Sequence, residues 1–154
     1  MTAQHDLAQV ARAVIDANSY MTIATADRAG QPWPSPVWYA HATYREFFWV
    51  SSPAARHSRN LADRPEAGIV IFDSHVPAGQ AQAVYLTATA DEVPADELTG
   101  SIDVYSARSL ALGLHRWAPG DVRAPACLRV YRASVTEVFV IDGFDRRIPT
   151  RIGE

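Results

Sequence analysis

The segment that decides the fold reads Val50-Ser51-Ser52-Pro53-Ala54-Ala55-Arg56-His57-Ser58-Arg59-Asn60-Leu61. It follows the aromatic run Phe47-Phe48-Trp49, which predicts a strand over residues 46–50. Ser52 is then expected to be a helix N-cap and Pro53 the first helical residue, with the helix running to about Asp63. The segment therefore predicts a strand that leads directly into the N-terminus of a helix.

A helix start of this kind can hold a phosphate, because its first N–H groups lack partners and its dipole favours negative charge. Ser51 and Ser52 add hydroxyl donors. Arg56 offers a planar fork to phosphate oxygens, and a protonated His57 would supply a second charged donor. The alternative is that Ser52 only caps the helix while the basic side chains form a solvated face. These physical arguments leave both interpretations open.

The strand expected over residues 31–40 carries prolines at alternate positions: Pro32, Pro34 and Pro36. Backbone N–H groups two residues apart point to the same side of a strand, so the prolines remove donors from one edge only. The residues between them keep theirs for a neighbouring strand: Trp33, Ser35 and Val37. Protection of an edge strand against aggregation explains this spacing, and so does an edge that faces a ligand.

The remaining pattern predicts a mainly β protein with flanking helices. Helices are expected over residues 6–17 and 94–114, and strands over 20–25, 67–72, 82–93 and 127–141. Short connections favour antiparallel pairing, and a small number of strands favours closure into a barrel. Residues 1–154 are expected to form a single domain.

The composition limits the partners and the location. A net charge of −3 without any lysine argues against nucleic-acid binding, which needs a basic patch. Cys127 is the only cysteine, so no intramolecular disulfide forms, and its apolar context predicts a buried small residue. The five histidines lack metal-site spacing, so no metal is expected. The absence of a signal-peptide pattern and of a long apolar run predicts a cytoplasmic protein that does not enter membranes.

Five segments within residues 7–142 share their order and spacing with a known family: Met21-Thr22-Ile23-Ala24-Thr25, Pro34-Ser35-Pro36-Val37-Trp38-Tyr39, Arg56-His57-Ser58-Arg59-Asn60-Leu61 with Pro65, Ala83-Val84-Tyr85-Leu86-Thr87-Ala88-Thr89-Ala90, and Arg129-Val130-Tyr131-Arg132. On these segments the chain resembles the pyridoxamine 5′-phosphate oxidase-like family of FMN-binding proteins. The resemblance implies an antiparallel split β-barrel of Greek-key type. It also implies a homodimer with FMN at the interface.

The resemblance assigns cofactor contacts to four places in the chain. The isoalloxazine ring would lie along Ser35, Pro36, Val37, Trp38 and Tyr39, bound in part by the N–H groups of residues 37–39. The end of the next strand and the helix start would hold the phosphate through Val50, Ser51, Arg56, His57 and Ser58. Gln82 would reach the flavin from a neighbouring strand. Trp117 would approach it from the second subunit, unless it is an ordinary core tryptophan.

Two departures from the family matter. Many relatives have lysine where this chain has His57, which is a weaker phosphate ligand at neutral pH. The tail at residues 145–149 also lacks the Arg-x-His pair with which the true pyridoxamine phosphate oxidases bind their substrate. Oxidation of vitamin B6 is therefore not the expected reaction.

The expected function is an FMN-dependent oxidoreductase that acts on an unidentified small molecule, with no catalytic side chain assigned. A deazaflavin-dependent reductase of the same fold is the nearest alternative. A non-catalytic binder of flavin or haem is another, and haem would take His57, His75 or His115 as an axial ligand. A small barrel without a cofactor also remains possible from the sequence.

Overall fold

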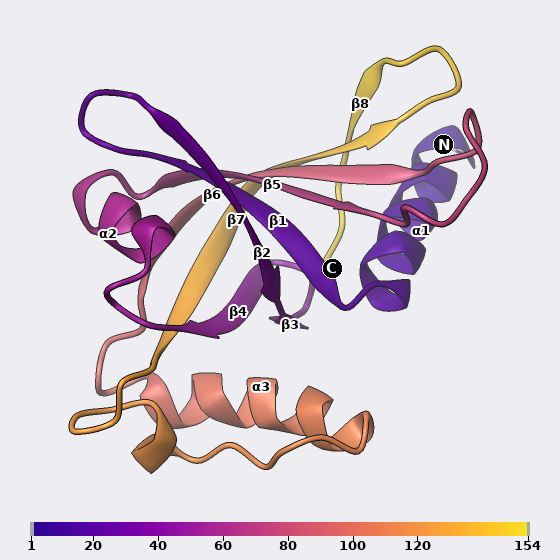
Figure 1. The fold of residues 1–154 in the computed structure, drawn as a ribbon. Coiled ribbons are helices and arrows are strands. Elements are labelled where there is room, and N and C mark those ends of the chain that lie inside the picture. The colour runs from indigo at the N-terminus through magenta and orange to yellow at the C-terminus, as the bar shows by residue number, and fades with distance from the viewer. Residues whose placement is uncertain (1, 154) are drawn as a thin grey trace.

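The computed structural model describes residues 2–153, and the side chains of residues 6–153. Within these residues, three α-helices and eight strands follow one another, joined by loops and one short 3-10 turn at Pro119–Asp121 (Figure 1). In chain order they are α1 (Thr2–Ala17), β1 (Tyr20–Ala26), β2 (Pro32–Trp38), β3 (Ala40–Ala42), β4 (Glu46–Ser51), α2 (Arg56–Asp63), β5 (Glu66–Phe72), β6 (Ala83–Glu92), α3 (Leu98–Ala111), β7 (Arg129–Ile141) and β8 (Arg147–Thr150).

All eight strands belong to one antiparallel sheet with the order β2-β1-β5-β6-β7-β4-β3, and β8 pairs with β7. The sheet curls into a half-barrel, as the resemblance implied. The long strand β7 pairs with β6 along one edge, and its other edge pairs with β4 at one end and with β8 at the other. In Figure 1, α1 lies at one end of the curled sheet and α3 beneath it, while α2 lies near the start of β5.

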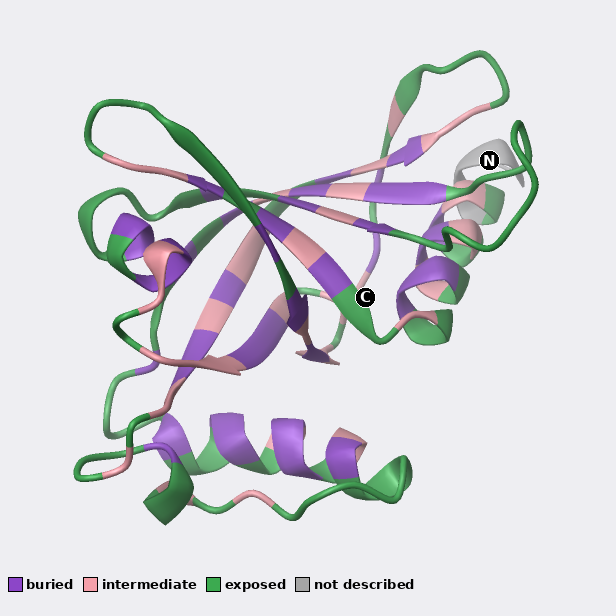
Figure 2. Cartoon of the chain, in the orientation of Figure 1, coloured by how far each residue is buried: buried purple, intermediate pink, exposed green. Residues whose placement is uncertain are grey.

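Side-chain alternation along β4 divides the apolar interior into two clusters. Phe47 and Trp49 are fully buried in the larger cluster, inside the curl and against α1. Phe48 points the other way, into a smaller cluster with Ile102 and Tyr105 of α3. The buried bands of Figure 2 follow this division, with one face of α3 turned to the sheet. A single aromatic strand therefore anchors both layers.

Strand β2 is an edge strand within the described residues, because it pairs only with β1. The N–H of Tyr39 donates to the carbonyl of Ser19 at 3.3 Å, which places the N–H of every odd-numbered residue of β2 on the side of β1. The prolines lie on the open side, as their spacing predicted. The expectation that the N–H groups of residues 37–39 all face a ligand is wrong, because only Trp38 has an N–H on the open edge.

Helix α2 begins at Arg56 rather than at Pro53. The hydroxyl of Ser52 accepts the N–H of Ala54, and the carbonyl of Ser52 accepts the N–H of Ala55. Residues 52–55 therefore form a separate turn and not the first turn of the helix. Ala55 is the N-cap and has no side chain that could satisfy the helix. The predicted N-cap role of Ser52 is therefore wrong, and the helix N-terminus is left more open than the sequence suggested.

Other boundaries also differ from the sequence-based expectations. Residues 94–97 form a turn before α3, with the N–H of Glu97 donating to the carbonyl of Pro94. The short strands β3 and β8 were not expected, and both exist only because a longer strand lies beside them. Cys127 is exposed rather than buried, because β7 starts two residues later, at Arg129.

None of the helices within residues 2–153 combines the length and the hydropathy that crossing a bilayer requires.

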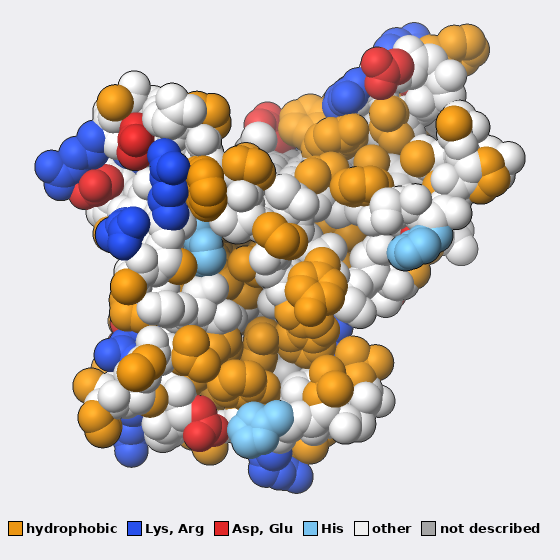
Figure 3. Space-filling model, viewed as in Figure 1, with side chains coloured by type: hydrophobic (Ala, Val, Ile, Leu, Met, Phe, Trp, Pro, Cys, Tyr) orange, Lys and Arg blue, Asp and Glu red, His pale blue; other side chains and the backbone are white. Residues whose placement is uncertain are grey.

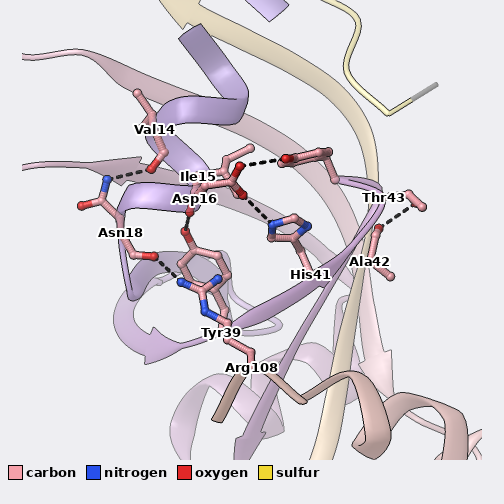
Figure 4. Close-up of polar contacts among 10 residues, drawn as sticks. Val14, Ile15, Asp16, Asn18, Tyr39, His41, Ala42, Thr43 and Arg108 are labelled. Atoms are coloured by element: carbon pink, nitrogen blue, oxygen red, sulfur yellow. Dashed lines mark hydrogen bonds and ion pairs between the residues drawn. The ribbon is translucent and has the colours of Figure 1, made fainter. Parts of the chain in front are cut away.

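The buried hydroxyl of Tyr39 offers a test of how the barrel is fastened to α1. It donates to the carbonyl of Ile15 at 2.6 Å, and the residue is fully buried (Figure 4). The substitution Tyr39→Phe should lower the free energy of unfolding by about 1–3 kcal/mol, because a buried carbonyl loses its donor. Urea denaturation measures the change. Tyr85→Phe is the control, because the hydroxyl of Tyr85 only accepts an exposed hydrogen bond of 3.3 Å from Arg147. It should lower the free energy of unfolding by less than Tyr39→Phe does. Equal losses would contradict the assignment.

Candidate cofactor site

The N-terminus of α2 presents free backbone donors. The first helical bond is that from the N–H of Arg59 to the carbonyl of Ala55. Within residues 2–153, no backbone acceptor is found for the N–H groups of the three preceding residues, Arg56, His57 and Ser58. Together with the helix dipole, these groups favour an anion at this point.

The side chain of Arg56 stands beside these donors. Its guanidinium carbon lies 4.4 Å from the centre of the Trp33 ring, so the charge is held over an aromatic face of β2. Oδ2 of Asp27 lies 4.0 Å from Nη2 of Arg56, too far for a hydrogen bond, while Oδ1 of Asp27 accepts the N–H groups of Ala29 and Gln31 in the hairpin turn. Arg56 therefore keeps hydrogen-bond donors available, and 39% of its side chain is exposed.

His57 has a different role from the one the sequence suggested. The residue is 8% exposed, and its Nε2 lies 2.9 Å from the hydroxyl of Ser51. Burial lowers the pKa of His57 below the ordinary 6.5. The ring is therefore neutral at neutral pH and holds Ser51 in place, rather than adding a second positive charge.

A chain of hydrogen bonds ties α2 to the edge strand. The amide of Asn60 donates to the hydroxyl of Thr25 on β1 at 3.0 Å, and that hydroxyl donates to the carbonyl of Trp33 on β2 at 3.2 Å. Asn60 and Thr25 are both buried. Neither was identified as a site residue from the sequence. The two residues lie in elements far apart in the chain, so only the fold reveals that they form a buried polar pair.

Ser58 lies on the side of α2 opposite to Arg56. Its buried side chain lines a pocket of about 410 Å³ together with Tyr131 of β7 and Asp91 of β6. Successive residues of a helix turn by about 100°, so the side chains of residues 56 and 58 diverge. Only the backbone N–H of Ser58 belongs with the anion site, whereas its hydroxyl faces the other pocket.

The other end of β2 carries aromatic side chains. Trp38 makes an edge contact with Tyr105 of α3 at 4.9 Å between ring centres, and Tyr105 contacts Trp117 at 5.6 Å. The N–H of Trp117 donates to Ser106, so this tryptophan packs on α3 of the same chain. Hydrophobic side chains cover the face between β2 and α3, while one group of charged side chains lies around α2 and the β1–β2 hairpin (Figure 3).

The predicted site residues thus fall into two groups. Strand β2, with Ser35, Pro36 and Trp38, lies near the β4–α2 junction, which carries Val50, Ser51, Arg56 and His57. The backbone groups of Pro36 and Trp38 face the open edge, whereas those of Ser35 face β1. Gln82 lies apart: it lines a pocket with Ala13 and Asn18 beside α1, at the end of the sheet away from α2. Within one protomer it does not meet Arg56, so its flavin contact stays a prediction, as does that of Trp117 across a dimer.

The site therefore has an anion-binding end and a planar end. Trp33 and Trp38 mark the two ends of the exposed strand, which at 3.3 Å per residue are about 17 Å apart. Along this length the open edge offers the carbonyls of the prolines and the single N–H of Trp38. An elongated molecule with a phosphate at one end and a flat heterocycle at the other matches this arrangement.

A family model described as pyridoxamine 5′-phosphate oxidase matches residues 7–142. The chain belongs to this family.

Solved structures of similar fold include haem-binding and flavin-binding members. A heme binding protein from Mycobacterium smegmatis matches with 25% identity and a TM-score of 0.73, over 93% of this chain and 57% of that one. The heme storage protein HutZ from Vibrio cholerae matches with 22% identity and a TM-score of 0.67, over 88% and 95%. A FAD-binding protein from Mesorhizobium loti matches with 20% identity and a TM-score of 0.65, over 86% and 92%. This chain thus spans little more than half of the mycobacterial protein.

A search of curated proteins found no match. In the part of the chain that the structure describes, no group of three His, Cys, Asp or Glu residues is placed to hold a metal ion.

The neutral state of His57 predicts a pH-dependent stability. Because the pKa is lowered in the folded protein, the unfolded chain binds more protons below about pH 6.5. The contribution of His57 to the free energy of unfolding is therefore complete above about pH 6.5. It is lost as the pH falls through the pKa that His57 has in the folded protein. Urea denaturation at pH about 7.5 and about 5 should show this loss, and His57→Gln should reduce it. A pH dependence identical in the variant would contradict the assignment.

Proposed function

We propose that this protein binds FMN along β2, with the phosphate at the N-terminus of α2, and that it acts as a flavin-dependent oxidoreductase. The single observation that supports this most is the pairing of Arg56 with three free N–H groups beside an edge strand that cannot extend the sheet. Membership of the pyridoxamine 5′-phosphate oxidase family agrees with it.

The residues present fit a flavin mononucleotide at both ends. Arg56, the hydroxyl of Ser51 and the N–H groups of residues 56–58 would hold the phosphate, with a single side-chain positive charge because His57 is neutral. The N–H of Trp38 can donate to an oxygen or nitrogen of the ring, and the proline carbonyls can accept from its N–H. Pro34 and Pro36 keep this edge free of a neighbouring strand.

FMN would supply the redox chemistry when bound. The chain's own residues would fix its position and exclude water from one side through the aromatic groups Trp38, Tyr105 and Trp117. No general acid or base is assigned, because hydride transfer to or from the flavin needs none from the protein. The substrate would be a small molecule that stacks on the exposed face of the ring.

Haem binding is the second candidate, because the structural neighbours include haem-binding proteins. His115 is the histidine that would be available: its side chain is 65% exposed, next to Trp117 at 5.2 Å between ring centres. His57 is buried against Ser51, and His75 lies on the exposed β5–β6 loop. The absorption spectrum of the purified protein separates the candidates, since flavin has two visible bands, deazaflavin one band at shorter wavelength, and haem a sharp Soret band.

Replacement of Arg56 tests the phosphate site. Arg56→Gln removes the charge while keeping a polar side chain, and should weaken FMN binding by about tenfold or more, because a charge-assisted contact is lost. Quenching of flavin fluorescence measures the affinity. Arg28→Gln, which removes an equally charged but 82% exposed side chain from the adjacent hairpin, is the matched control and should bind normally. Equal binding by both variants would refute the site.

We also propose that a second copy of the chain completes the site, as the family resemblance implies. Large apolar side chains remain exposed, with Tyr20 at 61% and Leu114 at 54%. Light scattering should give a dimer, and Tyr20→Glu should shift it toward the monomer together with a loss of flavin affinity. A monomer that binds FMN normally would contradict this part of the proposal.

A further inference from the structure

A second concave site lies between the end of α1, strand β3 and α3. The groove has a volume of about 650 Å³, which is within the usual range for small-molecule sites. Its floor consists of small apolar side chains: Ala40, Ala42, Val104, Ala107 and Ala111. Asp16 and Arg108 stand in its lining, and no other acidic or arginine side chain does.

Asp16 forms the anionic side of this groove. One carboxylate oxygen lies 3.0 Å from Nε2 of His41, and the other accepts the hydroxyl of Tyr44 at 2.8 Å (Figure 4). The ring of His41 is itself fixed by stacking on Tyr44, with 4.4 Å between ring centres. The carboxylate is therefore held in one orientation, although 53% of the side chain remains exposed.

Arg108 forms the cationic side. Its Nη2 donates to the carbonyl of Asn18 at 2.6 Å, and its guanidinium carbon lies 4.7 Å from the centre of the Tyr39 ring (Figure 4). Among the described residues no carboxylate lies within ion-pair distance of it. The guanidinium of Arg108 is thus held in place by neutral groups, and it keeps free N–H donors.

Asp16 and Arg108 line the same groove without forming an ion pair with each other. Both act on Tyr39: the pKa of its hydroxyl is raised to about 12, mainly by burial, while Arg108 lowers it and Asp16 raises it. Because the two charges do not pair with each other, a ligand that carries a cation and an anion can contact both and gain electrostatic attraction at each end.

We propose that this groove binds a small zwitterion of the amino acid class, with Asp16 contacting its ammonium group and Arg108 its carboxylate. The small side chains of the floor leave room for an apolar side chain of the ligand, which Leu112 would border. The site is separate from the anion site at α2, and it does not depend on whether the protein binds flavin.

The test uses three probes that share one carbon skeleton and differ in the charged groups they carry. Wild-type protein is titrated with L-leucine, with leucinamide, which lacks the anion, and with 4-methylpentanoate, which lacks the cation, and binding is followed by amide shifts in NMR spectra. L-Leucine should bind, shift residues around β3 and the end of α3, and exceed each partial probe by about tenfold or more in affinity. Equal affinities for the three probes, or no binding of L-leucine, would overturn the proposal.

Two substitutions locate the contacts. Asp16→Asn and Arg108→Gln should each weaken binding of L-leucine by about tenfold or more. Asp103→Asn and Arg123→Gln change the same charges at exposed positions outside the groove and should leave it unchanged. Unchanged affinity in a folded Asp16→Asn or Arg108→Gln protein would contradict the assignment. The probe comparison on the wild-type protein decides the question if a variant does not fold.

Discussion

The arrangement of the site depends on a strand that can pair with a neighbouring strand on one side only. In β2, the odd-numbered residues face β1, and the alternate prolines leave the opposite edge without N–H donors up to Trp38. No further strand can pair there in a regular ladder. The sheet must therefore end at β2, and it continues instead at its other edge through β7 and β4. The result is a curled sheet with one permanently open edge.

In the proposed function, the open edge of β2 holds the cofactor, because α2 is fixed beside it. The bonds from Asn60 through Thr25 to the carbonyl of Trp33 connect the helix to both strands of the first hairpin. They place the helix N-terminus next to Trp33, and the ring of Trp33 in turn positions Arg56. Buried polar groups of this kind have no alternative partner, so the relative position of helix and strand is well determined.

Much of this could be read from the sequence, and the failures have physical reasons. The proline spacing predicted the open edge, and the aromatic run at 47–49 predicted the strand that joins both cores. The start of α2 was misplaced, because Ser52 and Pro53 fit a helix start and a turn equally well, and only the tertiary position of Arg56 decides between them. The charge of His57 could not be predicted, because its pKa depends on burial against Ser51. Strands β3 and β8 depend on partners distant in the chain.

The most direct test of the central claim compares the affinities of the protein for FMN and for riboflavin, which has the same ring and ribityl chain without the phosphate. If Arg56 and the N-terminus of α2 hold the phosphate, FMN should bind at least about tenfold more tightly than riboflavin at moderate salt. Equal affinities for the two flavins would mean that the phosphate makes no favourable contact. The N-terminus of α2 would then not be the phosphate site.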